Sequence, residues 1–278
     1  MNPIVILLAD GNAFFIGSFL AVLGVVGRSW KVGWLGRSVL RVTSAIGVVF
    51  IAASGTPFSI WVYCVWGGLW LAVSFMPIAR TRRFAAPCFL LISISLCLLE
   101  VPWHMSPHIP HTPGQQVYVI GDSISAGIDP SELTWPSVLG DIAHLNVTNL
   151  ARPGATASTA LSQVDGITAP NSLVIIEIGG NDMLGGTDTD QFFEDLKTLL
   201  SRIPPSCHCV MFELPVLPFK NGYDRAQRNL ATRYKVILIP KQCLADAIGG
   251  KGNTLDGLHL SQKGHNALAE SVLRLLVM

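Results

Sequence analysis

Long apolar stretches fill the first hundred residues, and they constrain the fold of this chain more than any other feature. A helix needs about 20 mostly apolar residues to cross the hydrocarbon core of a bilayer. Four stretches have this character, with soft edges: residues 4–26, 39–54, 58–78 and 84–101. Asp10 and Asn12 interrupt the first stretch and leave its outer boundary the least sharply defined. We therefore expect an all-α transmembrane domain of about four helices over residues 1–101.

The charges divide the chain at the same place. Only 13% of the residues are charged, against roughly 25% in a typical soluble protein. Residues 1–101 hold seven Lys or Arg and two Asp or Glu, and residues 102–278 hold twelve and sixteen, so the two parts carry +5 and −4. An apolar, positive part before a mildly acidic one indicates a membrane segment followed by a soluble domain. Neither part has the basic footprint of a nucleic-acid-binding protein, so we exclude nucleic acid as a partner.

The positive charges of the first part also predict its orientation. They gather in the link between the first two stretches and in the link between the last two: Arg28, Lys31, Arg37 and Arg41, then Arg80, Arg82 and Arg83. By the positive-inside rule both links are cytoplasmic. Four spans then place the N-terminus and the soluble part on the extracytoplasmic side, periplasmic or extracellular. A cleaved signal peptide is the alternative for the first stretch, but it needs an early positive region and the first cationic residue is Arg28.

A proline-rich segment joins the two parts. Residues 102–114 read PWHMSPHIPHTPG, and their four prolines predict an extended, semi-rigid linker. Its three histidines, His104, His108 and His111, raise the alternative of a metal site. Proline-rich backbone cannot present three side chains on one helical face. We therefore predict no metal and no cofactor.

The soluble part, residues 115–278, alternates between strand-like and helix-like segments. We expect strands over 117–120, 146–150, 173–178, 210–214 and 236–239, and helices over 135–143, 157–164, 190–203, 223–233 and 261–276. Thr189 is the expected N-cap of the third helix, and Ser261 that of the last. This alternation predicts an α/β fold with a parallel sheet covered on both faces. In such sheets reactive groups collect at the carboxyl ends of the strands.

A candidate nucleophile and its base follow strands of this sheet. Ser123, in Gly121-Asp122-Ser123, lies just past the first strand, where its side chain can be exposed. A serine hydroxyl needs a base to take its proton, and a carboxylate must orient that base. Asp256 and His259 are three residues apart on an expected turn and can touch directly. A solvated turn at Asp256–His259 is the alternative.

Donors for a developing oxyanion lie at the same edge. Acyl transfer builds negative charge on the carbonyl oxygen, and fixed donors aimed at it stabilise the transition state. Asn181 offers a side-chain N–H, while Gly154 and Ser123 offer backbone N–H groups. The alternative for Asn181 and Asp182 is a helix N-terminal cap.

These motifs together resemble the SGNH (GDSL-like) hydrolase family. Gly121-Asp122-Ser123, Gly154, Gly179-Gly180-Asn181-Asp182 and Asp256-x-x-His259 occur in the order and rough spacing of the family's four sequence blocks. The stretches 135–139 and 149–155 look like its arylesterase and lysophospholipase branch, and Ile124 replaces the leucine of the GDSL name. The resemblance implies a three-layer, flavodoxin-like fold over residues 115–278. It also implies that Ser123 is the nucleophile, His259 the base and Asp256 its orienter, with Ser123, Gly154 and Asn181 around the oxyanion.

The resemblance implies a serine esterase that acts through an acyl-serine intermediate, and the apolar stretches before it predict that it is anchored in a membrane. Its substrate is then a small-molecule, lipid or glycan ester, such as a lysophospholipid, an acylated glycan or a small lipophilic ester. Two alternatives stay open: an O-acyltransferase acting on a cell-surface glycan, and a membrane-bound scaffold that only binds a ligand. On an oxidising side of the membrane Cys243 could pair with Cys207 or Cys209.

Overall fold

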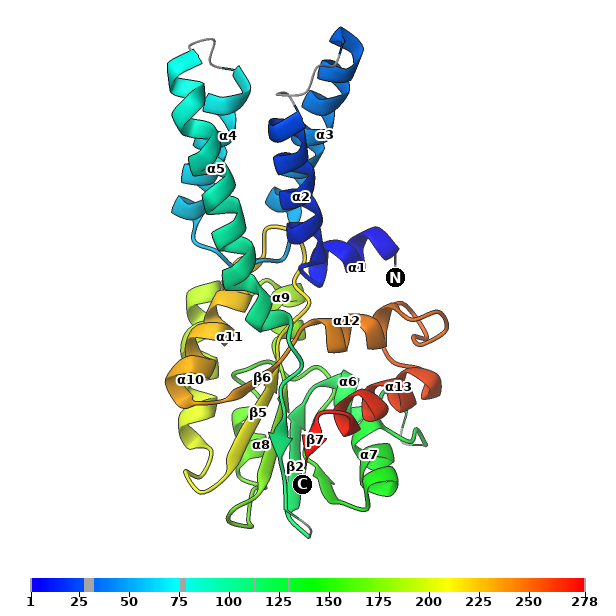
Figure 1. The fold of residues 1–278 in the computed structure, drawn as a ribbon. Coiled ribbons are helices and arrows are strands. Elements are labelled where there is room, and N and C mark those ends of the chain that lie inside the picture. The colour runs from blue at the N-terminus through cyan, green and yellow to red at the C-terminus, as the bar shows by residue number, and fades with distance from the viewer. Residues whose placement is uncertain (1, 28–32, 76–78, 113, 130, 278) are drawn as a thin grey trace. The chain divides into compact units, whose positions relative to one another are not determined.

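The computed structural model describes residues 2–27, 33–75, 79–112, 114–129 and 131–277. Its contacts divide the chain into two compact units, and each is described by itself (Figure 1). The α/β unit comprises Met1–Ile6, Met105–Val216 and Gly222–Met278. The helical unit comprises Leu7–His104 and the short segment Leu217–Asn221.

A five-stranded parallel sheet forms the centre of the α/β unit. Its strand order is β3-β2-β4-β5-β6. The strands are β2 (Gln116–Gly121), β3 (Asn146–Asn149), β4 (Leu173–Glu177), β5 (His208–Phe212) and β6 (Ile237–Ile239). Strand β4 is buried along its whole length, as its β-branched run predicts. The parallel α/β fold expected from the sequence is confirmed.

Helices cover both faces of this sheet (Figure 1). Helix α13 packs against α7 and against α12, and α8 packs against α10. The helices of the unit are α6 (Ser123–Ala126), α7 (Trp135–Ala143), α8 (Leu161–Val164), α9 (Gly180–Gly185), α10 (Thr189–Arg202), α11 (Asn221–Tyr234), α12 (Gln242–Gly249) and α13 (Gln262–Leu273). Side chains of the sheet and of α7, α12 and α13 share one continuous hydrophobic core.

The helix caps agree with the sequence at one helix and differ at another. Ser261 caps α13, since its hydroxyl accepts the N–H of Gly264 at 3.3 Å. Thr189 was the expected cap of α10, but it is the first residue of that helix. The cap is Asp188, whose carboxylate accepts the N–H of Asp190 at 2.9 Å. A carboxylate at this position satisfies one of the unpaired N–H groups of the first turn.

The proline-rich segment contributes a strand to the α/β unit. Ile109–Pro110 forms β1, which pairs in parallel with β7 (Leu276–Val277) at the end of the chain. The side chain of Ile109 is fully buried in the core of the unit. Part of the segment expected to link two domains therefore packs as part of the second one.

The helical unit is built mainly from α2 (Asn12–Val26), α3 (Trp34–Ala53), α4 (Ile60–Phe75) and α5 (Ala79–Glu100), with a 3-10 turn at Val101–His104. Two helices are long and apolar enough to cross a membrane, Trp34–Ala53 and the segment Phe84–His104. Helix α1 (Pro3–Ala9) and α2 would make a third span, but they are bent by 87° at the break that Asp10 and Asn12 had marked. Helix α4 has 16 residues, which cover about 24 Å of a hydrocarbon core that is about 30 Å thick.

The expectation of about four spans is therefore met only in part. By length and composition the described residues give two candidate spans, or three with the bent pair. The basic residues Arg28 and Lys31, and the end of the third predicted stretch at residues 76–78, lie outside the described residues.

Small residues bring α2 and α3 into close contact. A Cβ atom added at Gly47 would lie 2.5 Å from the carbonyl oxygen of Gly17 and 2.6 Å from the backbone nitrogen of Ala21. A Cβ at Gly24 would lie 2.5 Å from the carbonyl oxygen of Leu40. In a membrane there is little hydrophobic force between helices, so such backbone contact supplies much of their packing energy.

Replacing Gly47 by alanine is expected to lower the thermal stability of the full-length protein, because the methyl group would collide with the backbone of α2. Gly68, on α4, is the matched control, since a Cβ there has open space around it. Alanine is about 1 kcal/mol better than glycine inside a helix, so Gly68→Ala should keep or raise the unfolding temperature. A melt of both variants in detergent measures this, and equal effects would contradict the close packing of α2 on α3.

Candidate active site

The turn after β2 presents the candidate nucleophile. Strand β2 ends at Gly121 and α6 begins at Ser123, with Asp122 as the N-cap between them. The Asp122 carboxylate accepts the N–H of Ile124 at 2.9 Å. Ser123 is half-buried, and as the first residue of a helix its backbone N–H has no partner within that helix. Its N–H is therefore available to an acceptor outside the helix.

The Gly121 backbone is fixed from the opposite side by Gln163. The side-chain amide of Gln163 accepts the Gly121 N–H and donates to the Gly121 carbonyl, both at 2.9 Å. These two hydrogen bonds hold the end of β2 in place, and they therefore also position the start of the Ser123 turn.

Asp256 and His259 form the contact that the sequence predicts. The Nδ1 atom of His259 lies 2.6 Å from Oδ2 of Asp256. The other carboxylate oxygen of Asp256 accepts the backbone N–H groups of Leu258 and His259, at 2.9 and 2.8 Å. Gly257 has φ +92°, a left-handed conformation that glycine adopts readily. With Nδ1 bonded to the carboxylate, the neutral imidazole leaves Nε2 as its proton acceptor.

These hydrogen bonds change the acidity of the carboxyl group. The bond to the His259 ring, followed by the two backbone N–H groups, holds the pKa of Asp256 well below its usual range. Asp256 is therefore an anion at any physiological pH, which is the state that orients a histidine and stabilises its protonated form.

Asn181 lies beside the Ser123 turn. Its side-chain nitrogen donates to Oδ2 of Asp122 at 3.0 Å and to the carbonyl of Ala155 at 3.1 Å. Gly154, the residue before Ala155, has φ +74°. Asn181 therefore links the turn after β2 to the loop after β3, which carries the Gly154 N–H.

The structure does not support the capping alternative for Asn181 and Asp182. The N-cap of α9 is Gly179, and no side chain caps that helix. The carboxylate of Asp182 is buried and accepts the N–H of Ala157 at 2.9 Å. Asp182 thus fixes the loop that follows Gly154.

The motif analysis missed Glu177, the last residue of β4. Its side chain is fully buried beneath the Ser123 turn, where Oε2 accepts the Ser125 hydroxyl at 2.9 Å and lies 3.4 Å from the Asp122 nitrogen. The Ser125 hydroxyl in turn accepts the indole N–H of Trp135 at 3.0 Å. One signal could have identified it: Glu177 is the only charged residue in the apolar run 173–178.

The carboxyl groups of Asp122 and Glu177 face each other in this buried site. Burial raises the pKa of Asp122 to about 6, although its bonds to Ile124 and Glu177 and the charge of His259 act in the opposite direction. Burial, and then the negative charge of Asp122, raise the pKa of Glu177 well above its usual value. Glu177 therefore keeps its proton when Asp122 is ionised, and the two carboxyl groups share one negative charge.

The structure thus brings most of the sequence-predicted residues to one edge of the sheet. Hydrogen bonds connect the Ser123 turn, Asn181 and the loop after Gly154, and the charge of His259 acts on Asp122. Within the described part of the chain, Ser123 Oγ makes no hydrogen bond. Catalytic hydrogen bonds are often long in enzymes without substrate and shorten when it binds.

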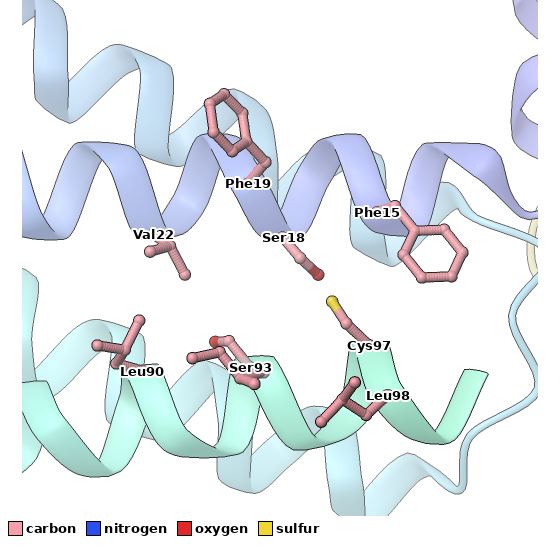
Figure 2. A pocket seen from close by; sticks show the side chains of 9 residues that line it. Phe15, Ser18, Phe19, Val22, Leu90, Ser93, Cys97 and Leu98 are labelled. Carbon is pink, nitrogen blue, oxygen red and sulfur yellow. The ribbon is translucent and has the colours of Figure 1, made fainter. Parts of the chain in front are cut away.

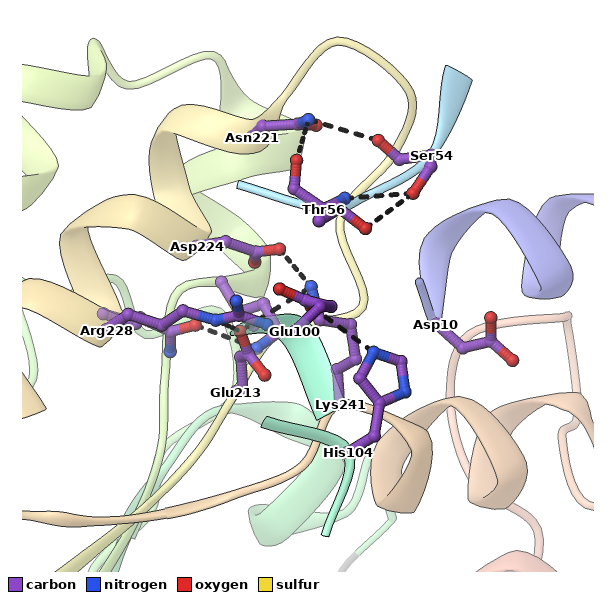
Figure 3. Close-up of polar contacts among 12 residues, drawn as sticks. Asp10, Ser54, Thr56, Glu100, His104, Glu213, Asn221, Asp224, Arg228 and Lys241 are labelled. Atoms are coloured by element: carbon purple, nitrogen blue, oxygen red, sulfur yellow. Dashed lines mark hydrogen bonds and ion pairs between the residues drawn. The ribbon is translucent and has the colours of Figure 1, made fainter. Parts of the chain in front are cut away.

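A buried ionic cluster lies just beyond the carboxyl ends of β5 and β6 (Figure 3). Glu213 follows β5, Lys241 lies beyond β6, and Asp224 and Arg228 come from α11. Arg228 Nε lies 2.5 Å from Glu213 Oε1, and Lys241 pairs with Asp224 and, at 3.6 Å, with Glu213. Burial raises the pKa of Asp224 to about 7 against the opposing effect of Lys241. The cluster fixes α11 to the sheet, since loss of one buried partner would leave another charge uncompensated.

All six cysteines are free thiols, so the structure contains no bond between Cys243 and Cys207 or Cys209. Cys207 precedes the amino end of β5, whereas Cys243 lies in α12, beyond the carboxyl end of β6. These positions belong to opposite edges of the sheet. Among the described residues, no group of three or more His, Cys, Asp or Glu is arranged to hold a metal ion.

Comparison with known proteins gives the class to which this fold and site belong. The chain is 29% identical over 179 residues to an arylesterase of Vibrio mimicus, covering 59% of this chain and 88% of that one. It is 28% identical over 175 residues to the esterase TesA of Pseudomonas aeruginosa, covering 57% and 86%. A crystal structure of TesA superposes with a TM-score of 0.52 at 26% identity, over 58% of this chain and 97% of that one.

These relatives are ester hydrolases, and so is this protein. The sequence profile of the GDSL-like Lipase/Acylhydrolase family matches residues 119–267, more than half of the chain. The chain belongs to this family. The esterase EstA of Pseudoalteromonas, at 18% identity and a TM-score of 0.51 over 58% of this chain and 95% of that one, shares the fold.

The Glu177→Gln variant is expected to have a flatter dependence of stability on pH than the natural protein. Between the ordinary pKa of a glutamic acid, 4.5, and its raised value in the fold, the native state binds more protons than the unfolded chain. The free energy of unfolding therefore falls as the pH rises through this window. Glutamine can accept the hydrogen bond from the Ser125 hydroxyl but cannot ionise. The part of the fall in unfolding free energy that Glu177 causes should therefore disappear in the variant.

Thermal unfolding of the full-length protein at a series of pH values tests this. Glu194→Gln is the matched control, because that carboxylate is exposed on α10. If Glu177→Gln follows the same pH curve as the natural protein and the control, the shared-proton arrangement is wrong.

Proposed function

We propose that this protein is a membrane-anchored, extracytoplasmic serine esterase that cleaves carboxylic esters through an acyl-serine intermediate. The observation that carries the proposal is the 2.6 Å contact between Asp256 and His259, together with the Ser123 turn and Asn181 at the same edge of the sheet. The names of its relatives, arylesterase and esterase, support the same chemistry.

In the first half of the reaction, Ser123 Oγ attacks the carbonyl carbon of the ester and His259 Nε2 takes the hydroxyl proton. Asp256 stabilises the imidazolium that forms, as carboxylates do in triads of this type. When the tetrahedral intermediate collapses, the bond to the alcohol oxygen breaks and His259 returns the proton to that oxygen. The alcohol leaves and the acyl group stays on Ser123.

Three N–H donors are proposed to stabilise the oxyanion: the backbone groups of Ser123 and Gly154 and the side chain of Asn181. In the substrate-free structure both protons of the Asn181 amide are directed at Asp122 and Ala155. Substrate must therefore draw one of them onto the oxyanion, away from Asp122 or from Ala155.

In the second half, water attacks the acyl carbon while His259 takes its proton. Collapse of the second tetrahedral intermediate releases the carboxylic acid and returns the proton to Ser123. The substrate classes that suit this scheme are lysophospholipids, acylated glycans and small lipophilic esters.

The Ser123→Ala variant is expected to lose at least about a thousandfold in kcat, because removal of a triad nucleophile leaves only binding and oxyanion stabilisation. The measurement uses full-length protein in detergent with short- and long-chain p-nitrophenyl esters. Ser137→Ala, an exposed serine on α7, is the matched control and should turn over at the natural rate.

Equal turnover by Ser123→Ala and the natural protein would rule out the acyl-serine scheme. If both are folded and neither cleaves any ester, simple ester hydrolysis is excluded. Adding a glycan acceptor and analysing the products would then test acyl transfer to a sugar hydroxyl.

Reporter fusions are expected to place the α/β unit outside the cytoplasm. The support is the positive-inside rule, since both basic links read as cytoplasmic. Alkaline phosphatase, active only outside, should be active when fused after Ser54 and Met278 and inactive after Arg83. A cytoplasmic reporter should give the opposite pattern, and its activity after Met278 would contradict the proposed side.

A further inference from the structure

An apolar groove runs between α2 and α5 within the helical unit (Figure 2). Its volume is about 260 Å³. The residues that line it are Phe15, Ser18, Phe19 and Val22 from α2, and Leu90, Ser93, Ile94, Cys97 and Leu98 from α5. None of them is charged.

The groove exists because α2 uses two different faces. Its glycine face, with Gly17 and Gly24, packs closely on α3. Phe15, Ser18 and Val22 lie on another face of α2, toward α5 (Figure 2).

The hydroxyl groups at the floor of the groove already have partners. Ser93 Oγ accepts the indole N–H of Trp66 at 2.9 Å and donates to the carbonyl of Phe89 at 2.8 Å. The Ser18 hydroxyl and the Cys97 thiol point toward each other (Figure 2). Because the Ser93 hydroxyl is hydrogen-bonded within the protein and the Ser18 hydroxyl faces Cys97, the groove offers a mainly apolar surface to a ligand.

Buried polar groups lie beside Phe15, outside the lining of the groove. The ring of Phe15 packs edge-on against the ring of His104, with centroids 4.9 Å apart. His104 Nε2 lies 3.4 Å from the carboxylate of Glu100, which is almost fully buried one turn beyond Cys97. Thr56 is also buried. It lies near His104, since a Cβ added at Gly11 would be 3.2 Å from the His104 ring and 3.8 Å from Thr56 Oγ1. The groove is therefore apolar along its length, and polar groups lie next to its Phe15 end.

We propose that this groove binds the acyl chain of a single-chain lipid, with the polar end of that lipid toward Glu100 and His104. The choice of an ester lipid as ligand rests on the proposed function, and the groove would then give that function its substrate class. A cavity of about 150 Å³ lined by apolar side chains binds benzene in another protein, so the present volume suits one chain.

A second helix is a poor occupant for this groove. A helix with its side chains is about 10 Å across or more, and membrane helices pack through small residues that let backbones approach. The rim here carries large exposed side chains instead: Phe19, Ile94 and Leu98. Such a rim leaves room for a thin, flexible hydrocarbon chain.

The test uses full-length Ser123→Ala protein in phospholipid nanodiscs, so that the ligand is not consumed. The probe is a lysophosphatidylcholine with a photoreactive diazirine on its acyl chain, and mass spectrometry locates the adducts. We expect adducts on the segments 15–22 and 90–98, and we expect excess unlabelled lysophosphatidylcholine to suppress them.

Two variants that fill the groove should lower the yield of these adducts at least about tenfold. They are Val22→Phe from α2 and Ile94→Trp from α5, so that one remains if the other fails to fold. Each methylene excluded from the groove should weaken binding about fourfold. The matched controls, Val49→Phe on α3 and Leu91→Trp on α5, change exposed residues outside the lining and should label like the parent protein.

Adducts spread evenly over the lipid-exposed faces of α3 and α4, or equal labelling of the filled variants and their controls, would overturn the proposal. A cross-linked pair of protein chains through the groove would overturn it as well, in favour of a second copy. Because the measured quantity is binding in an inactive protein, these outcomes are separate from the esterase assay, which alone decides the proposed function.

Discussion

The pairing of β2 with β4 is the constraint on which the candidate site depends. In this parallel register Gly121 lies opposite Glu177, so the last residues of two strands that are distant in sequence become neighbours. The turn carrying Ser123 and the turn carrying Asn181 then leave the sheet side by side. A slip of one residue would send every side chain of β4 to the other face, and Glu177 would no longer lie beneath the nucleophile.

This register buries the carboxyl groups of Asp122 and Glu177 next to each other. Such burial is costly unless both groups are hydrogen-bonded. Here one proton is shared between them, and the surrounding donors are Ile124, Ser125 and Asn181. The same bonds that compensate the buried charge also determine where Ser123 and Asn181 lie. The polar network of the α/β unit therefore serves its stability and the geometry of its site at once, and Asp182 extends it to the loop after Gly154.

The helical unit is held together by different contacts, in which small residues and single hydrogen bonds join apolar helices. Glycines let α2 and α3 approach to backbone contact. Indole hydrogen bonds to serine hydroxyls join α4 to α5 and to α3. On the face of α2 toward α5 a groove remains. Close packing and an open groove are thus two results of one helix sequence.

The sequence by itself determined the parallel α/β fold and the family, because hydrophobic periodicity and the order of the motifs can be read directly along the chain; the division into a membrane part and a soluble part stays a prediction. It also predicted the contact of Asp256 with His259, since three residues on one turn are near each other in any fold. The catalytic roles of Ser123, Asp256 and His259, and of Gly154 and Asn181, stay predictions. Only the tertiary structure decided that Glu177 lies under Ser123, that Asn181 bonds to Asp122, that Ile109 belongs to the core and that two helices clearly have the length of a span. Each of these depends on strand register, on helix ends or on contacts between distant segments, and the free energy of such contacts is not encoded in any single stretch of sequence.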